Sequence, residues 1–258
     1  MLMVISPAKT LDFELPAPST QHTQPELLNH SAELIALMRH YSPSDLAVLM
    51  SISDKLAVLN AGRFHHWHTP FSLHNAKPAL FAFRGDVYEG LDADTLPTER
   101  IDWLQQHLRI LSGLYGCLRP LDLMQPYRLE MGIRLSNARG KDLYAFWGDI
   151  ITTHLNAAQD DVHTPVLVNL ASGEYFKAVK VRHLKARVIT PVFQEEKNGQ
   201  FKIVSFQAKR ARGLMVRWAA RHTVDDPEQL KAFDSEGYCF DGTASSADTW
   251  YFRRKNTG

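Results

Sequence analysis

Cysteine is scarce in this chain, and the short motifs of several common enzyme classes are missing. Cys117 and Cys239 are the only cysteines among 258 residues, and they stand far apart with no CxxC or zinc-ligand spacing. Such usage is typical of a reduced compartment, where each cysteine packs as a small apolar residue. The sequence also lacks Walker A, GxGxxG, GxSxG and HExxH patterns. It therefore gives no support for a P-loop, dinucleotide-binding, serine-hydrolase or zinc-protease site.

Long hydrophobic runs are also missing. No apolar stretch approaches the roughly 18 to 20 residues that a membrane-spanning helix needs. Residues 1–9 become polar too quickly for a signal peptide. The composition, with 45% hydrophobic and 22% charged residues, is that of a globular protein with a substantial core. We therefore expect a cytoplasmic protein with no membrane partner.

Acidic residues are nearly absent from one window, residues 177–217. It holds eleven Lys and Arg against only Glu195 and Glu196, so it carries +9 in a chain whose total is +1. An electropositive surface of this kind favours phosphate groups. The alternative is that acidic residues from elsewhere fold over the window and neutralise it.

Apolar periodicity predicts strands and helices mixed along the chain. Strands are predicted at residues 2–5, 79–83 and 166–170, and the pair Asn198-Gly199 predicts a type I′ hairpin joining 188–193 to 201–206. Helices are predicted from Pro25, Pro43 and Ser53 onwards, and at 101–111, 141–155 and about 207–222. With no internal repeat or linker, this mixture predicts one compact α+β (mixed α/β) domain over residues 1–258.

Residues 46–57 match most of the helix-hairpin-helix pattern h-x-x-h-x-G-h-G-x-x-x-A, in which h is apolar. The apolar and small positions hold Leu46, Leu49, Ile52 and Ala57, whereas serines stand where glycines are usual. In this motif a tight turn presents the first backbone N–H groups of the second helix to a DNA phosphate. We expect such an element at about residues 43–64, with Lys55 close to the same phosphate. Two packed helices of an ordinary core are the alternative.

The basic window has internal order. Lys177 and Lys180 lie one turn apart, and Arg210, Arg217 and Arg221 share one face of the predicted last helix. Guanidinium groups pair bidentately with phosphate oxygens, so this arrangement favours a basic cleft for DNA. The expected DNA-binding set is Ser51, Ser53, Lys55, Lys177, Lys180, Lys209, Arg210, Arg212 and Arg217. A solvated face paired with carboxylates is the alternative.

Polar loops supply a second candidate site. Loops dense in charged residues and tyrosine often line pockets, and the candidates are Lys9, Asp86, Tyr88, Arg119, Arg128 and Glu130. The histidines of residues 65–68 have no further ligand at useful spacing, so we expect no metal site.

Several strings together resemble the YaaA family of bacterial peroxide-stress resistance proteins. They are ISPAKTL (5–11), ISDKL (52–56), GDVY (85–88), LSGLYG (111–116), RPLDLMQPYR (119–128), NLAS (169–172), EYFK (174–177) and KRARG (209–213). The resemblance spans nearly the whole chain. It implies a cytosolic protein that helps cells survive hydrogen peroxide and is associated with limiting free intracellular iron. It also implies DNA binding through a helix-hairpin-helix and a basic cleft, links to DNA repair, and a family-specific single-domain fold.

Three functions follow from these features. The first is non-enzymatic, sequence-nonspecific binding of duplex or branched DNA, with no cofactor. The second is a glycosylase/lyase, since Lys55 occupies the position of the Schiff-base lysine in glycosylases with this hairpin. Those enzymes also carry an Asp roughly 20 residues downstream, and none stands between Lys55 and Asp86. The third is a small-molecule enzyme around Asp86, Arg119, Arg128 and Glu130 with a phosphate-bearing substrate.

Overall fold

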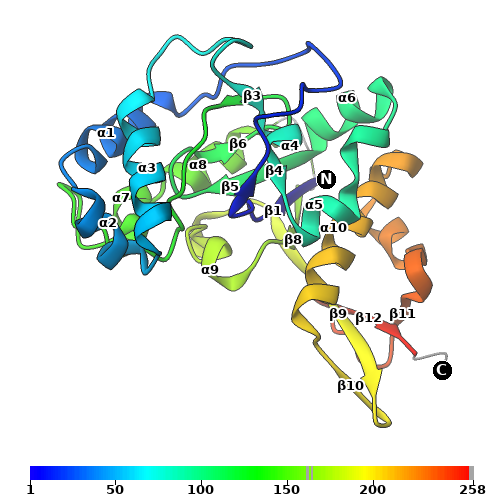
Figure 1. Ribbon diagram of the computed structural model, residues 1–258. Coiled ribbons are helices and arrows are strands. Elements are labelled where there is room, and N and C mark those ends of the chain that lie inside the picture. The colour runs from blue at the N-terminus through cyan, green and yellow to red at the C-terminus, as the bar shows by residue number, and fades with distance from the viewer. Residues whose placement is uncertain (161–162, 164, 256–258) are drawn as a thin grey trace.

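A mixed β-sheet runs through the centre of the molecule (Figure 1). The computed structural model describes residues 1–160, 163 and 165–255. The eight-stranded sheet has the order β11-β12-β9-β8-β1-β5-β6, with β10 paired to β9. Its strands are β1 (Leu2–Ile5), β5 (Leu108–Ser112), β6 (Gly116–Leu118), β8 (Val166–Leu170), β9 (Arg187–Lys197), β10 (Gln200–Lys202), β11 (Cys239–Asp241) and β12 (Thr249–Arg254).

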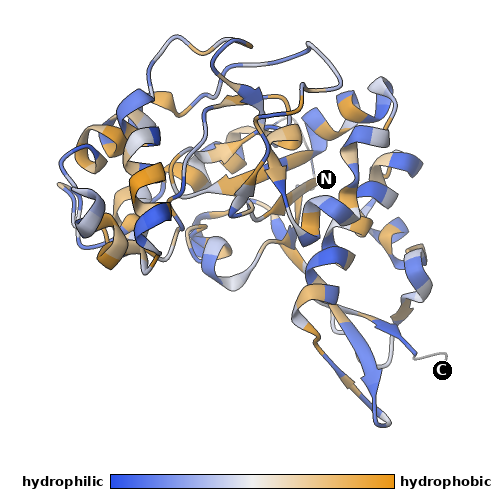
Figure 2. Ribbon diagram, in the orientation of Figure 1, coloured by the Kyte–Doolittle hydropathy of each residue, from blue (hydrophilic) through white to orange (hydrophobic). Residues whose placement is uncertain are grey.

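The middle of this sheet is parallel. β1 lies between β5 and β8 and runs parallel to both, and β8, β9 and β12 continue in the same direction. All four residues of β1 are buried, because a central parallel strand is covered on both faces. Figure 2 shows the same central strands as largely apolar.

The chain reverses its direction of travel across the sheet at β1. It passes from β1 to β5 on one side and later returns to β8 on the other side of β1. The carboxyl ends of β1 and β8 therefore adjoin at a topological switch point. In open α/β sheets this is the place where ligands bind.

Helices surround the sheet in two groups. Figure 1 shows α1, α2, α3 and α7 on one side of the view and α5, α6 and α10 on the other. The helices are α1 (Leu28–Met38), α2 (Pro43–Met50), α3 (Asp54–His66), α4 (Ala79–Ala82), α5 (Asp86–Leu91), α6 (Thr98–His107), α7 (Leu143–Trp147), α8 (Ile150–Ala157), α9 (Gly173–Phe176) and α10 (Ser205–His222). Two further two-stranded pairs join β2 (Thr10–Leu11) to β4 (Phe83–Arg84) and β3 (Lys77–Pro78) to β7 (Leu123–Met124). Together these elements make one compact mixed α/β domain, as the sequence predicted.

The predicted hairpin turn and the predicted helix start at Pro43 are both confirmed, and the structure adds a capping box at the second. Asn198 and Gly199 have φ values of 55° and 72°, as a type I′ turn requires. Ser42 and Asp45 form a capping box at the start of α2, in which the Asp45 N–H donates to Ser42 Oγ at 3.2 Å. The first fixes the β9–β10 hairpin, and the second fixes where α2 begins.

Other boundaries differ from the prediction. The predicted strand at 79–83 is the helix α4, followed by β4. The predicted helix at 101–111 ends at His107, and β5 begins at Leu108. Residues 108–111 continue the apolar stripe of α6, so periodicity alone extends the helix. Pairing with β1 overrides it, because the central strand needs a partner on each edge.

The remaining corrections concern helix ends. The predicted helix at 141–155 is split by Gly148, whose φ of 46° breaks it into α7 and α8. The second strand of the hairpin ends at Lys202, and α10 begins at Ser205 instead of Gln207. The first helix begins at Leu28, a full turn after Pro25. Within the residues described, no helix combines the length and apolar character needed to traverse a bilayer.

Candidate functional site

A cavity of about 430 Å³, lined by several charged side chains, lies beyond the carboxyl ends of β1 and β8. We call it the switch-point cavity. Its walls come from the loop after β1, from α5, from the loop that carries Glu130, from α9 and from α10. The lining includes Ser6, Lys9, Asp86, Tyr88, Glu130, Ser172, Glu174, Tyr175, Lys209 and Arg212. Its volume falls in the usual range for small-molecule sites.

Two serines join the loops that leave β1 and β8. Ser172 donates its backbone N–H to Ser6 Oγ at 2.8 Å, and the two hydroxyl oxygens lie 3.3 Å apart. Tyr88 donates its hydroxyl to the Ser6 carbonyl at 3.1 Å. The floor of the cavity is therefore held by hydrogen bonds among the strand ends and α5.

Close packing of α5 against α10 places the cations of α10 beside α5. A Cβ on Gly90 would lie 2.1 Å from the Arg210 carbonyl oxygen, so the two helix backbones approach closely at this glycine. As a result the Lys209 ammonium lies 3.9 Å from the Asp86 carboxylate. Arg212 follows three residues later and lines the same cavity.

Arg212 has no compensating partner in the part of the chain that the structure describes. No carboxylate lies within ion-pair distance of its guanidinium, and no hydrogen bond is made by its side chain. Burial lowers the pKa of this guanidinium from its ordinary value, and no nearby charge opposes that effect. A half-buried cation without a counter-ion is a strong anion ligand.

Among the residues described, only one of the two carboxylate oxygens of Glu130 has polar partners. Arg128 donates to its Oε1 at 2.9 Å, and the Lys9 ammonium lies 3.4 Å from the same oxygen. The other oxygen, Oε2, is buried and has no hydrogen-bond partner within the described ranges. The loop is fixed at this point because Gly113 lies so close to the Leu129 carbonyl that a Cβ would come within 2.1 Å of it.

Glu174 is held in place by hydrogen bonds on its side chain and on its backbone. Glu174 Oε1 accepts the Gly132 N–H at 2.9 Å, and Tyr144 donates its hydroxyl to the Glu174 carbonyl at 2.9 Å. Burial raises the pKa of Tyr88 and Tyr175 well above the ordinary value of a phenol. Both tyrosines are therefore neutral hydrogen-bonding groups.

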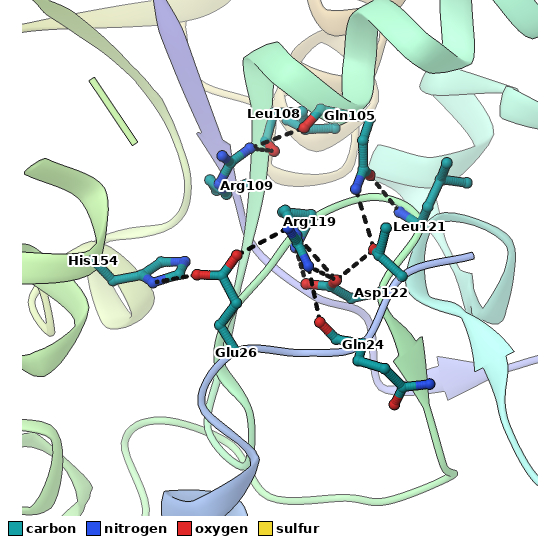
Figure 3. A network of polar contacts seen from close by, with 10 residues as sticks. Gln24, Glu26, Gln105, Leu108, Arg109, Arg119, Leu121, Asp122 and His154 are labelled. Carbon is teal, nitrogen blue, oxygen red and sulfur yellow. Dashed lines mark hydrogen bonds and ion pairs between the residues drawn. The ribbon is translucent and has the colours of Figure 1, made fainter. Parts of the chain in front are cut away.

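The structure brings four of the six predicted pocket residues together in this cavity, namely Lys9, Asp86, Tyr88 and Glu130. Arg128 reaches it only by pairing with Glu130. Arg119 lies elsewhere. It pairs with Asp122 and Glu26, and Glu26 also meets His154, in the network of Figure 3.

The predicted DNA-binding residues are spread over three regions. Ser51, Ser53 and Lys55 are exposed at the turn between α2 and α3. Lys177 ends α9, with its ammonium 4.7 Å from the centre of the Tyr144 ring, and Lys180 follows three residues later. Lys209 and Arg212 line the switch-point cavity, as described above.

Two predicted DNA contacts are instead engaged within the fold. Arg210 pairs with Glu236 at 2.7 Å. Arg217 lies 3.3 Å from the Asp92 carboxylate and donates to the Leu91 carbonyl at 2.9 Å. For these two side chains the alternative of a face paired with carboxylates holds. The histidines at 65–68 form no metal cluster, and no group of three potential ligands is present elsewhere in the described ranges.

Sequence reasoning missed Ser6, Ser172, Glu174 and Tyr175 as site residues. The signal was available for Ser6 and Ser172, since each closely follows a short apolar run that forms a parallel strand. Strand ends of this kind meet at one edge of a sheet. The pairing of β1 with β8, however, joins residues about 165 positions apart and cannot be read from local patterns.

The fold and cavity define a mixed α/β protein with a ligand-sized site, lined by charged side chains, at the carboxyl edge of its sheet. Residues 1–244 match the family model described as "Peroxide stress protein YaaA". The chain is 63% identical over 254 residues to a UPF0246 protein of Chromobacterium violaceum, covering 98% of this chain and 99% of that protein. It is 59% identical over 255 residues to one of Janthinobacterium (99% of each) and 57% over 254 residues to one of Neisseria gonorrhoeae (98% of each). The chain belongs to the YaaA family of peroxide stress proteins.

Proposed function

We propose that this protein binds the phosphate backbone of DNA in the cytoplasm during the response to hydrogen peroxide. The observation that carries this proposal is the grouping of cations around the switch-point cavity. Lys9, Lys209 and Arg212 line the cavity. Lys177 and Lys180 are outside this lining and follow α9, which contributes Glu174 and Tyr175 to it. Cations contributed by separate segments are the kind of contact that a backbone-binding protein makes with phosphates.

The turn between α2 and α3 supports a second phosphate contact. Ser51 has a φ of 51°, so it adopts the left-handed conformation that glycine would supply in a helix-hairpin-helix. Ser53 makes no side-chain cap for α3, which leaves the first N–H groups of the helix available to an anion. Lys55 is exposed in the same turn. We propose that this hairpin and the cations around the cavity hold the same DNA.

The proposal predicts a steep salt dependence. Contacts to roughly five phosphates give a slope of about −4.5 in log K against log salt, or a loss of several hundredfold between 50 and 200 mM salt. Fluorescence anisotropy with a labelled duplex measures this directly. Lys55→Gln and Lys177→Gln should each reduce the slope by about one. Lys185→Gln is the control, since Lys185 pairs with Asp160 at 2.8 Å. A flat salt response would rule out backbone binding.

The preferred form of DNA and the link to iron are part of the same proposal. A four-way junction compared with a duplex of equal length would reveal a preference for branched DNA. In cells that lack this protein, the unaltered chain should restore survival of peroxide and a low level of free iron. Lys55→Gln should restore both less well. If Lys55→Gln restores both fully, DNA contact at this hairpin is not the basis of protection.

The lyase alternative has little support. A Schiff-base lysine needs an environment that favours its neutral amine, whereas Lys55 is exposed and lies outside the switch-point cavity. Borohydride trapping on DNA with an abasic site tests this directly, because a covalent adduct would restore the enzymatic hypothesis.

A further inference from the structure

The switch-point cavity has features that backbone binding leaves unused. A protein contacts the phosphodiesters of DNA with side chains on its surface. Arg212, in contrast, is half-buried and has no counter-ion in the described ranges. Glu130 Oε2 is a buried acceptor with no partner there. Each arrangement costs free energy in the unliganded protein. A ligand anion would supply the counter-ion that Arg212 lacks, and a ligand donor would meet the Glu130 carboxylate, which contributes to the same lining.

We propose that the switch-point cavity binds a nucleotide-sized phosphomonoester, with its phosphate at Arg212 and Lys209 and a hydrogen-bond donor of its organic part at Glu130. A monoester is favoured over a carboxylate because two cations one helical turn apart match a dianion. The cavity volume of about 430 Å³ accommodates a nucleotide and is larger than phosphate alone needs.

The charges in the cavity favour this orientation of the ligand, with its phosphate toward α10. Asp86 lies 3.9 Å from Lys209, which is a weak contact. Glu130 is already matched by Arg128 at 2.9 Å. Within the residues described, Arg212 is therefore the cation left without a carboxylate on the α10 wall. The opposite wall carries the carboxylates of Glu130 and of Glu174, whose Oε1 accepts the Gly132 N–H. Tyr88 and Tyr175 are neutral and buried between these charged walls, so their rings can contact a sugar or a base.

This inference does not rest on DNA binding, because it assigns a small-molecule site whose occupancy can be measured alone. The same ligand chemistry could come from a free mononucleotide or from the terminal phosphate of a DNA strand. Both present a monoester dianion on a sugar. Calorimetry with deoxyadenosine monophosphate represents the first source, and competition by a short 5′-phosphorylated oligonucleotide represents the second.

The test is isothermal titration calorimetry of the full chain in a phosphate-free buffer. Deoxyadenosine monophosphate should bind at least tenfold more tightly than deoxyadenosine and than inorganic phosphate. Arg212→Gln and Lys209→Gln should each weaken it about tenfold or more. Lys209 is exposed, so Lys209→Gln reports on the site even if Arg212→Gln is poorly folded. Glu130→Gln should weaken the nucleotide and leave inorganic phosphate unchanged.

Arg210→Gln is the matched control on the same helix. Its guanidinium pairs with Glu236 and does not line the cavity, so nucleotide affinity should stay within twofold. The inference is overturned if deoxyadenosine binds as tightly as its monophosphate, if inorganic phosphate does so, or if Lys209→Gln changes nothing.

Duplex binding measured on the same variants separates this site from the proposed function. Lys55→Gln should weaken duplex binding and leave mononucleotide binding intact. If the unaltered chain binds the mononucleotide but does not bind duplex DNA, the proposed function is refuted and this site is not. Absence of mononucleotide binding by a chain that still binds duplex DNA would refute this site alone.

Discussion

Gly213 lies directly against the backbone of Val87, so closely that a Cβ on the glycine would come within 1.8 Å of the Val87 carbonyl oxygen. This contact and the matching one at Gly90 allow α5 and α10 to pack backbone to backbone. The same packing places Asp86 beside Lys209 at the mouth of the cavity. Stability and site geometry therefore depend on the same glycines.

Gly213→Ala should destabilise the protein. Alanine favours a helix by about 1 kcal/mol over glycine, but here the added methyl group must push two helices apart. Overpacking of this kind costs about 1–3 kcal/mol and sometimes more. We expect a net loss of about 1–2 kcal/mol in the free energy of unfolding, measured by urea denaturation, and weaker nucleotide binding.

Gly62→Ala is the matched control. Gly62 also lies inside a helix, α3, but nothing lies within 4 Å of a Cβ placed there. Only the helix preference remains, so this variant should be more stable by up to about 1 kcal/mol. Equal effects of the two substitutions would show that the close helix contact does not matter.

The sequence predicted much of the molecule where local physics decides. Asn198-Gly199 specifies its turn through backbone conformation, and Ser42 specifies the start of α2 through a capping box. It failed at residues 108–111, where the apolar residues Leu108, Ile110 and Leu111 suit a helix face and a buried strand equally well. Only the partner strand β1, more than 100 residues away, decides between them.

The candidate site shows the same division. Lys9 and Glu130 stand in loops, Asp86 begins α5 and Tyr88 lies within it, and all four were found from their local composition. The difference between Arg210, which pairs with a carboxylate, and Arg212, which pairs with none in the described part of the chain, could not be predicted from the sequence. The two side chains stand two residues apart on one helix, but the acid that neutralises Arg210 is Glu236, which a distant turn supplies.

Arg119→Ala should be among the most damaging changes outside the cavity. Asp122 is 1% exposed and accepts hydrogen bonds from the Arg119 guanidinium at 2.9 Å and from Thr23 at 2.6 Å. Removing Arg119 leaves that buried carboxylate without its counter-ion, which costs about 3–5 kcal/mol. Chemical denaturation measures the loss.

The double variant Arg119→Met with Asp122→Asn separates pairing from packing. With both charges removed, the loss should be clearly smaller than for Arg119→Ala, because no uncompensated charge stays buried. If the double variant is as unstable as the single one, the network in Figure 3 acts through packing and not through charge.

The two cysteines should differ sharply in reactivity. Cys117 is buried in β6, and burial raises the pKa of its thiol to about 12, whereas Cys239 is exposed. The thiolate is the reactive form. A thiol-specific reagent should therefore modify Cys239 alone in the native protein and both residues in denaturant.

Cys239→Ser tests this assignment and the response to peroxide. The native variant should show no modified thiol within the time that labels Cys239 in the unaltered chain. Mass spectrometry after treatment with hydrogen peroxide should find oxidation at Cys239 before Cys117. Early oxidation of Cys117 would mean that β6 opens in the native state.

Acid should destabilise the protein well above the range in which carboxylates titrate. Burial lowers the pKa of His107 and of His154 below the ordinary value of 6.5. The Asp225 and Glu26 carboxylates oppose this effect only in part. In the unfolded chain both rings titrate near 6.5, so as the pH falls through 6.5 the unfolded state takes up protons first. The stability that comes from keeping these two rings neutral is fully present above pH 6.5. It is lost as the pH falls from 6.5 to the folded-state pKa, at no more than about 1.4 kcal/mol per pH unit for each histidine.

Urea denaturation at pH 7.5, 6.5 and 5.5 measures this slope. His107→Gln and His154→Gln should each flatten it, because a glutamine takes up no proton in either state. His65→Gln is the control, since that ring is exposed at the end of α3. The amine of Met1, whose pKa burial also lowers, adds a change of the same sign that begins near pH 8. If stability is unchanged between pH 7.5 and 5.5, the two buried rings are not kept neutral by the fold.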